Sequence, residues 1–210
     1  MPFTKRDYNI LETLANKVRA MALPQIAAAF FAGDTANAGR RVRKLVAAKV
    51  LVKRRLIARR LPRINGPLFA WEPMLAAPSF ESLARKVTTR WLRLPTHLTD
   101  VYLATSRFSS VVGQRTTGRL AHPLHISHEL GVTEVYLQII MTRPKLAQLW
   151  VGEDGFPVKS IKRKQTPDAL IVASDGQPIL AIEFGGIYSA QRFKKFHRSC
   201  LARRLPYEIW

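Results

Sequence analysis

The 210-residue chain carries 34 Lys and Arg residues against 14 Asp and Glu, which gives a formal net charge of +20 and a pI near 11.1. A chain with this balance is expected to seek polyanions, either nucleic acid or an anionic membrane surface. A hydrophobic content of 47% argues against wholesale disorder, and the single cysteine, Cys200, excludes an internal disulfide and a cysteine-based zinc cage. The best apolar run, Ala20–Gly33, is interrupted by Pro24 and Gln25 and falls short of the roughly 20 residues that span a bilayer.

Three helices are predicted at the N-terminal end. Thr4 is placed to cap the first, with Asp7 at the reciprocal position of a capping box. Pro24 suits the first turn of the second helix, and Asp34 or Thr35 can cap the third. The exposed side of the first helix could serve a dimer contact, so a homodimer is compatible with this pattern.

The third predicted helix has an apolar face and a basic face. Long hydrogen-bond donors, and no carboxylate, fall at positions i, i+3, i+4 and i+7 of the basic face, which are Asn37, Arg40, Arg41 and Lys44. We expect the three cations to enter the major groove of DNA and the asparagine to read adenine. The alternative is a solvated basic helix.

A basic hairpin is predicted after this helix. Its first strand and turn carry cations expected to hold phosphates, namely Arg54, Arg55, Arg59, Arg60 and Arg63. The dipeptide Asn65-Gly66 favours a tight turn, after which Leu68–Glu72 would be the return strand. Residues 1–73 hold fifteen Lys or Arg against four Asp or Glu, more than solubility requires. A polar-faced helix that runs into a basic hairpin is similar to the recognition helix and wing of a winged helix-turn-helix.

A domain boundary is predicted at Pro73–Pro78, where two prolines flank an apolar stretch. The prediction is therefore two domains, residues 1–75 and residues 79–210, with an α+β or α/β fold for the whole chain. Ser79 is placed to cap the next helix, and a buried helix is expected to extend to Thr142.

Three histidines lie just before that buried helix, at positions 122, 125 and 128. Their closeness suggests a metal site, but Pro123 interrupts the helix that would align them. Polar packing or a DNA-facing role is the favoured interpretation.

Two carboxylates flank a predicted hairpin near the C-terminal end. If Asp175-Gly176 is its turn, Asp168 lies directly opposite Glu183, with Cβ atoms about 4.5–5.5 Å apart. Two such carboxylates can hold a divalent cation such as Mg²⁺. Alternatively, Asp168 caps the entry to its strand and Glu183 pairs with a basic neighbour.

This segment, Pro167-Asp168 followed by a hairpin and Glu183, resembles the core of PD-(D/E)xK nucleases. The helix and final strand after it would complete an αβββαβ core. The resemblance implies catalytic roles for both carboxylates, Mg²⁺ as cofactor, and a lysine at the position that Gly185 occupies here. A lysine on the following helix, Lys194 or Lys195, could substitute, and the acid on the preceding helix would be Glu134 or Glu129.

A broader resemblance covers most of the chain. The predicted winged helix, the segment LAHPLHISHELGVTEVYL and the later PDALI and LAIEFG are similar to the replication-relaxation family of plasmids and mobile elements. His128, Pro167, Asp168 and Glu183 match its pattern best. The resemblance implies binding of double-stranded DNA, tied to plasmid replication or transfer. Composition and the lack of a spanning apolar run add the expectation of a cytoplasmic, nucleoid- or plasmid-associated protein with no membrane, and contacts with other DNA-processing proteins are compatible with it. The family does not settle nuclease activity. Because Gly185 stands at the lysine position, we expect a restriction-endonuclease-like C-terminal domain that binds without cleavage and without a cofactor, and Mg²⁺-dependent DNA cleavage is the alternative.

Overall fold

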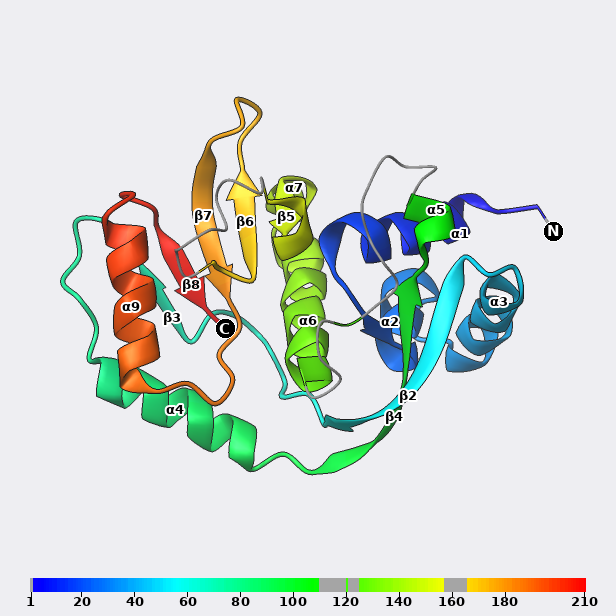
Figure 1. Ribbon diagram of the computed structural model, residues 1–210, viewed down its shortest axis with the longest axis horizontal. Helices are drawn as coiled ribbons and strands as arrows, with labels where there is room; N and C mark the ends of the chain where they lie inside the picture. Colours follow the sequence, from blue (N-terminus) through cyan, green and yellow to red (C-terminus); the bar gives the residue numbers. More distant parts are fainter. Residues whose placement is uncertain (1, 110–119, 121–124, 157–165) are drawn as a thin grey trace. The chain divides into compact units, whose positions relative to one another are not determined.

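The computed structural model describes residues 2–109, 120, 125–156 and 166–210, and its fold is mixed α+β (Figure 1). The chain divides into two compact units. Unit 1 comprises Met1–Leu61 and Thr96–Leu137, and unit 2 comprises Pro62–Pro95 and Gln138–Trp210. The predicted domains, residues 1–75 and 79–210, differ from these units because the chain leaves unit 1, builds part of unit 2 and then returns.

The three helices predicted for the N-terminal end are present in unit 1. They are α1 (Lys5–Glu12), which continues as the π-helical segment η1 (Thr13–Lys17), α2 (Leu23–Phe30) and α3 (Thr35–Ala47). The capping box at α1 is formed, since the Asp7 carboxylate accepts a hydrogen bond of 2.6 Å from the Thr4 backbone N–H. Asp34, of the two candidates, caps α3 by accepting from the Asn37 backbone N–H at 2.9 Å.

Unit 1 also contains a three-stranded sheet in the order β1-β4-β2. Its strands are β1 (Met21–Ala22), β2 (Leu51–Arg59) and β4 (Thr96–Ala104), and the short helix α5 (Ser106–Ser109) follows. All nine residues of β2 pair antiparallel with β4. Helix α6 (Ile126–Thr142) contributes Ile126 and Leu130 to a core that contains Ala58 and Val101 of the two strands.

The predicted return strand of the basic hairpin is wrong. The partner of β2 is β4, and the segment predicted as its partner forms β3 (Phe69–Trp71), which pairs with a strand of unit 2. The physical reason lies in Trp71, which is 1% exposed and stacks on Tyr207 at 5.4 Å between ring centroids. Burying a tryptophan in an aromatic core outweighs the local turn preference of Asn65-Gly66.

Unit 2 contains a five-stranded sheet in the order β3-β8-β7-β6-β5. After β3 come β5 (Trp150–Gly152), β6 (Ala169–Val172), β7 (Pro178–Glu183) and β8 (Tyr207–Ile209). The pairs β5–β6 and β6–β7 are antiparallel, whereas β8 lies parallel to β7. The parallel pair is joined through helix α9 (Ala190–Leu201), which supplies the long crossover that parallel strands require. The remaining helical segments are α4 (Phe80–Leu92), α7 (Pro144–Gln148) and η3 (Glu153–Gly155).

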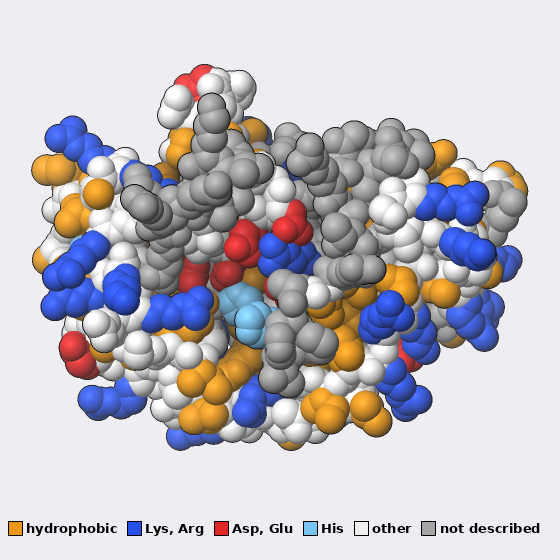
Figure 2. All heavy atoms as spheres, viewed as in Figure 1, with side chains coloured by type: hydrophobic (Ala, Val, Ile, Leu, Met, Phe, Trp, Pro, Cys, Tyr) orange, Lys and Arg blue, Asp and Glu red, His pale blue; other side chains and the backbone are white. Residues whose placement is uncertain are grey.

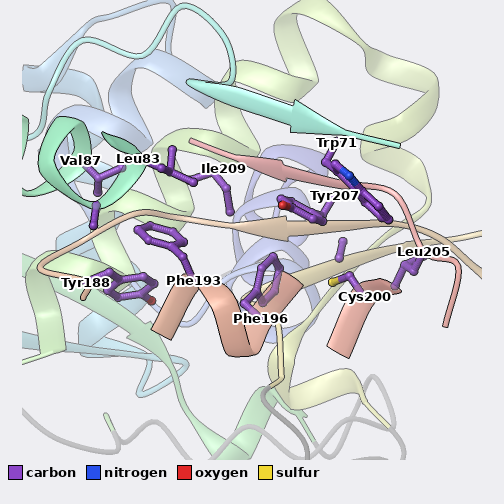
Figure 3. Close-up of a cluster of buried hydrophobic side chains, with 12 residues drawn as sticks. Trp71, Leu83, Val87, Tyr188, Phe193, Phe196, Cys200, Leu205, Tyr207 and Ile209 are labelled. Carbon is purple, nitrogen blue, oxygen red and sulfur yellow. The ribbon is translucent and has the colours of Figure 1, made fainter. Parts of the chain in front are cut away.

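The core of unit 2 lies between helices α4 and α9 and the sheet (Figure 3). Helix α9 directs an apolar stripe with helical spacing toward the strands, including Phe193, Phe196 and Cys200, which are at most 2% exposed. Helix α4 adds Leu83 and Val87. This packing explains why the sequence predicted both helices correctly, since each carries a periodic apolar face.

The register predicted for the carboxylate hairpin is confirmed, although its turn differs. Ala169 pairs with Ile182, so the next position along the ladder places Asp168 beside Glu183. The loop has three residues, Ser174–Gly176, closed by a bond from the Ala173 N–H to the Gln177 carbonyl. A bulge in the ladder compensates for the longer loop and restores the predicted pairing.

Candidate nucleic-acid interface and carboxylate pair

Helix α3 presents a basic face beside its buried one. Ala38, Val42 and Leu45 are fully buried and fix the rotation of the helix. Asn37, Arg40 and Lys44 are exposed on the other side, as predicted, and blue Lys and Arg side chains gather at this end of unit 1 in Figure 2. The Asn37 amide bonds to Asp34 and to Arg40, so both side chains are held close to the helix surface.

Arg41 has a different role from its predicted neighbours. Its Nε donates to Asp7 Oδ1 at 2.6 Å and its second guanidinium nitrogen to Asp7 Oδ2, which makes a bidentate pair between α3 and α1. Asp7 is 0% exposed. Burial alone would raise the pKa of Asp7, but the hydrogen bonds from Arg41 and Thr4 outweigh it and lower that pKa. Arg41 therefore fixes α3 against α1.

An open hollow of about 610 Å³ lies beside α3. Besides predicted residues of the helix, its lining includes Arg6 of α1, Phe31 after α2, and Arg43. The Arg6 guanidinium lies over the Phe31 ring, 4.6 Å from its centroid. Sequence reasoning missed both arginines. Arg43 could have been found from its place on the basic helix, whereas Arg6 reaches the hollow only through tertiary packing.

The cations predicted for the wing divide between the two units. Arg54 and Arg55 are exposed on β2, and Arg60 is exposed just beyond it. Arg59 is only half-exposed, and its backbone N–H donates to the Ser127 hydroxyl at 2.8 Å. Arg63 is exposed but belongs to unit 2, so it does not lie on the ribbon of β2 and β4.

The carboxylate pair lies on neighbouring strands of unit 2. Asp168 Oδ2 accepts a hydrogen bond of 2.7 Å from the backbone N–H of Phe184, the residue that follows Glu183. Glu183 is 1% exposed, and its Oε1 lies 3.8 Å from a guanidinium nitrogen of Arg192. Glu183 thus pairs with a basic neighbour, as in the alternative described above, while Asp168 bonds to the backbone just after β7.

Tyr188 and Arg192 complete this cluster. Arg192 donates to the Tyr188 hydroxyl at 2.7 Å, and its guanidinium lies 3.6 Å from the centroid of that ring. Burial raises the pKa of Tyr188 well above its usual value, and the charges of Glu183 and Asp168 raise it further. The phenol therefore stays protonated at neutral pH, which makes it unsuited to act as a nucleophile.

Arg192, and not the predicted Lys194, forms the ion pair with Glu183. Lys194 is exposed on α9, and two residues along a helix differ by about 200° in direction. Glu134 belongs to unit 1, where it accepts a 3.0 Å hydrogen bond from Gln25. Within unit 2 the structure brings together Asp168 and Glu183.

The described residues fit a Mg²⁺ site only in part, since the carboxylate pair offers two ligand side chains. Among the described residues, no group of three or more His, Cys, Asp and Glu side chains gathers where a metal ion could bind. His122 lies outside the described residues. The guanidinium beside Glu183 supplies positive charge where a cation would otherwise be needed.

Gly185, at the expected lysine position, leaves no room for a side chain. A Cβ there would lie 2.4 Å from Cγ1 of Val87, which is itself fully buried in α4. The close approach of helix α4 to the backbone at the end of β7 therefore explains why glycine, and not lysine, occupies this position.

We expect Gly185→Ala to destabilise unit 2 by about 1–3 kcal/mol, because the added methyl group forces Val87 to shift. Urea unfolding followed by tryptophan fluorescence measures this loss, since Trp71, Trp91, Trp150 and Trp210 all belong to unit 2. Gly66→Ala is the matched control, with no atom within 4 Å of the new Cβ. Adding Val87→Ala should recover part of the loss. A stability of Gly185→Ala equal to that of the control would contradict the packing argument.

Comparison of the chain with protein families, with curated proteins and with solved structures gives no match. The described part of the chain contains no helix long and apolar enough to cross a membrane.

Proposed function

We propose that the protein is a duplex-DNA-binding accessory or regulatory factor of a plasmid or another mobile element, acting in replication, transfer or transcription control. The observation that carries the proposal is the basic face of α3 beside the cationic ribbon of β2. Arg40, Lys44, Arg54 and Arg55 are exposed on these two elements. A cationic helix face that can enter the major groove, next to cations that can hold phosphates, is the arrangement of a winged helix-turn-helix.

The connectivity of unit 1 supports this interpretation. Three helices precede β2, and the short β1 joins the β2–β4 ribbon at its inner strand, in the order β1-β4-β2. This is the order expected of a winged helix in which the wing loop has been replaced by residues 62–95. The resemblance to the replication-relaxation family points in the same direction.

For unit 2 we propose a restriction-endonuclease-like domain that does not cut DNA. Three antiparallel strands, a helix and a fourth strand parallel to the third follow one another along the chain, which is the succession of a nuclease-like core. The carboxylate pair lies at the expected place in this succession. The closed position at Gly185 and the guanidinium of Arg192 weigh against cleavage. We propose a role in contacts with other DNA-processing proteins for this unit.

Salt dependence tests the proposed function. The logarithm of the affinity for duplex DNA should fall linearly with the logarithm of the salt concentration, with a slope of about −0.9 for each phosphate neutralised. Fluorescence anisotropy of a labelled duplex, titrated with protein at several salt concentrations, measures this slope. A flat response would mean that the basic surface serves another partner.

DNA cleavage by a metal-dependent mechanism is the second candidate, favoured by the adjacency of Asp168 and Glu183. Incubation of supercoiled plasmid with Mg²⁺ or Mn²⁺ at a saturating protein concentration distinguishes DNA cleavage from binding without cleavage. Nicking that disappears in Asp168→Asn would establish the nuclease. Under the function proposed here the plasmid stays supercoiled.

A further inference from the structure

The ribbon of β2 and β4 carries two large apolar side chains in solvent. Ile57 and Leu98 are 68% and 60% exposed, and they are directly paired across the two strands. Cross-strand partners have Cβ atoms about 5 Å apart, so the two side chains form a single apolar projection on one face of the ribbon. Because both side chains lie in water, they do not contribute the free energy of apolar burial that normally stabilises a strand.

The other face of the same ribbon is packed. Ala58, next to Ile57, is 1% exposed, and Leu56 packs on the core that contains Ile126 and Leu130 of α6. The alternation of a strand therefore fixes the direction of Ile57 and Leu98 away from the core of unit 1. A slip of register that would hide the pair would expose Ala58 and Leu56 in exchange.

Positive charge surrounds the apolar pair. On β2, Arg55 and Arg59 lie two residues to either side of Ile57 on the same face, and Arg54 is exposed nearby. The acidic group of the two strands, Asp100, is neutralised by Lys53 at 2.6 Å. Apolar side chains surrounded by cations suit the groove of a nucleic acid, which has phosphates along its edges and stacked bases at its centre.

We propose that Ile57 and Leu98 form a wedge that enters the minor groove of duplex DNA and bends the duplex. The neighbouring arginines contact the phosphates that flank the groove, and the apolar pair partly unstacks a base step. A two-stranded ribbon is wider than a minor groove of about 6 Å, so the side-chain pair alone enters and the groove widens as the duplex bends. Apolar wedges of this kind bend DNA by about 20–90°. This inference rests on the proposed function but adds a deformation of the DNA to it.

The test measures bending and binding on the same duplex. Energy transfer between dyes at the two ends of a duplex of about 25 base pairs reports its bend, and the anisotropy of one dye reports binding. We expect the full-length wild-type protein to increase the energy transfer at saturation. The double variant Ile57→Thr/Leu98→Thr should bind with an affinity reduced by less than about tenfold and leave the energy transfer at the value of free DNA.

The matched control is Ile187→Thr, which changes an isoleucine of similar exposure, 59%, in unit 2. This variant should bend DNA as the wild-type protein does. Binding by the wild-type protein without increased energy transfer, or unchanged bending by the double variant, would overturn the wedge and leave the proposed function standing. A protein that does not bind the duplex at all would overturn both. A double variant that bends DNA normally but no longer self-associates in light scattering would assign the pair to a protein contact and overturn the wedge.

Discussion

Arg41→Ala is expected to destabilise unit 1 by about 3 kcal/mol, the largest single-residue loss that we predict for this chain. The reason is the carboxylate left behind. Asp7 is 0% exposed and receives two guanidinium hydrogen bonds from Arg41. Removing the Arg41 side chain therefore leaves the buried Asp7 carboxylate without its main partner. Arg40→Ala removes an exposed cation one position earlier and should change the free energy of unfolding by no more than about 0.5 kcal/mol.

Urea unfolding followed by circular dichroism measures this loss, and tryptophan fluorescence reports on unit 2 in the same samples. We expect the dichroism transition of Arg41→Ala to begin at a lower urea concentration than that of Arg40→Ala. Equal transitions for the two variants would show that the pair with Asp7 contributes nothing to stability.

The loss should depend on pH with a definite sign. In the wild-type protein the pKa of Asp7 is lowered, so the pair stabilises the fold above the unfolded pKa of about 3.9, and that stability disappears as the pH falls through the folded pKa. Without Arg41, the hydrogen bonds from Thr4 oppose the effect of burial on the pKa of Asp7, and we expect burial to raise that pKa. The variant should therefore be least stable, relative to the wild type, at neutral pH. The stability difference between the two proteins should therefore be greatest near neutral pH and shrink as the pH falls from the raised pKa of Asp7 in the variant to its lowered pKa in the wild type.

The sequence predicted elements whose signals are local. The capping box of Thr4 and Asp7, the cap at Asp34 and the apolar stripe of α9 each depend on residues a few positions apart, and each is present. The register of the carboxylate hairpin was predicted from a two-residue turn, and it is present because a bulge compensates for the three-residue loop.

The partner of β2 could not be predicted in the same way. The segment after Asn65-Gly66 carries the local signal of a return strand, but the true partner, β4, begins at Thr96. The choice depends on where Trp71 can be buried, and that is decided by the aromatic core of unit 2. The division into units was missed for the same reason, since it follows from that pairing.

The candidate sites show the same limit. The basic face of α3 follows from helical spacing, but a helical wheel cannot show that Arg41 contacts Asp7 or that Arg6 lines the hollow. At the carboxylates the absence of a lysine was visible in the sequence, whereas its cause, the contact of Val87 with Gly185, was not. Arg192 was passed over for Lys194 because the resemblance called for a lysine, and the ion pair of Arg192 with Glu183 forms only in the folded unit.

The second large effect is expected at the exposed cations of α3. Arg40→Ala combined with Lys44→Ala should lower the affinity for duplex DNA roughly a hundredfold, about tenfold for each group, because each loses a contact to a base edge or a phosphate. Loss of phosphate contacts should also make the salt slope shallower by about one unit for each contact removed. Both side chains are exposed, so the fold should be unaffected.

The most direct test of DNA binding through α3 is an anisotropy titration of one labelled duplex with three proteins. These are the wild-type protein, Arg40→Ala/Lys44→Ala, and Lys194→Ala/Lys195→Ala, which removes the same two charges from exposed positions on α9. We predict roughly hundredfold weaker binding for the α3 variant, and an affinity for the α9 variant within about threefold of the wild type. Equal losses for the two variants, or a larger loss for the α9 variant, would contradict binding through α3.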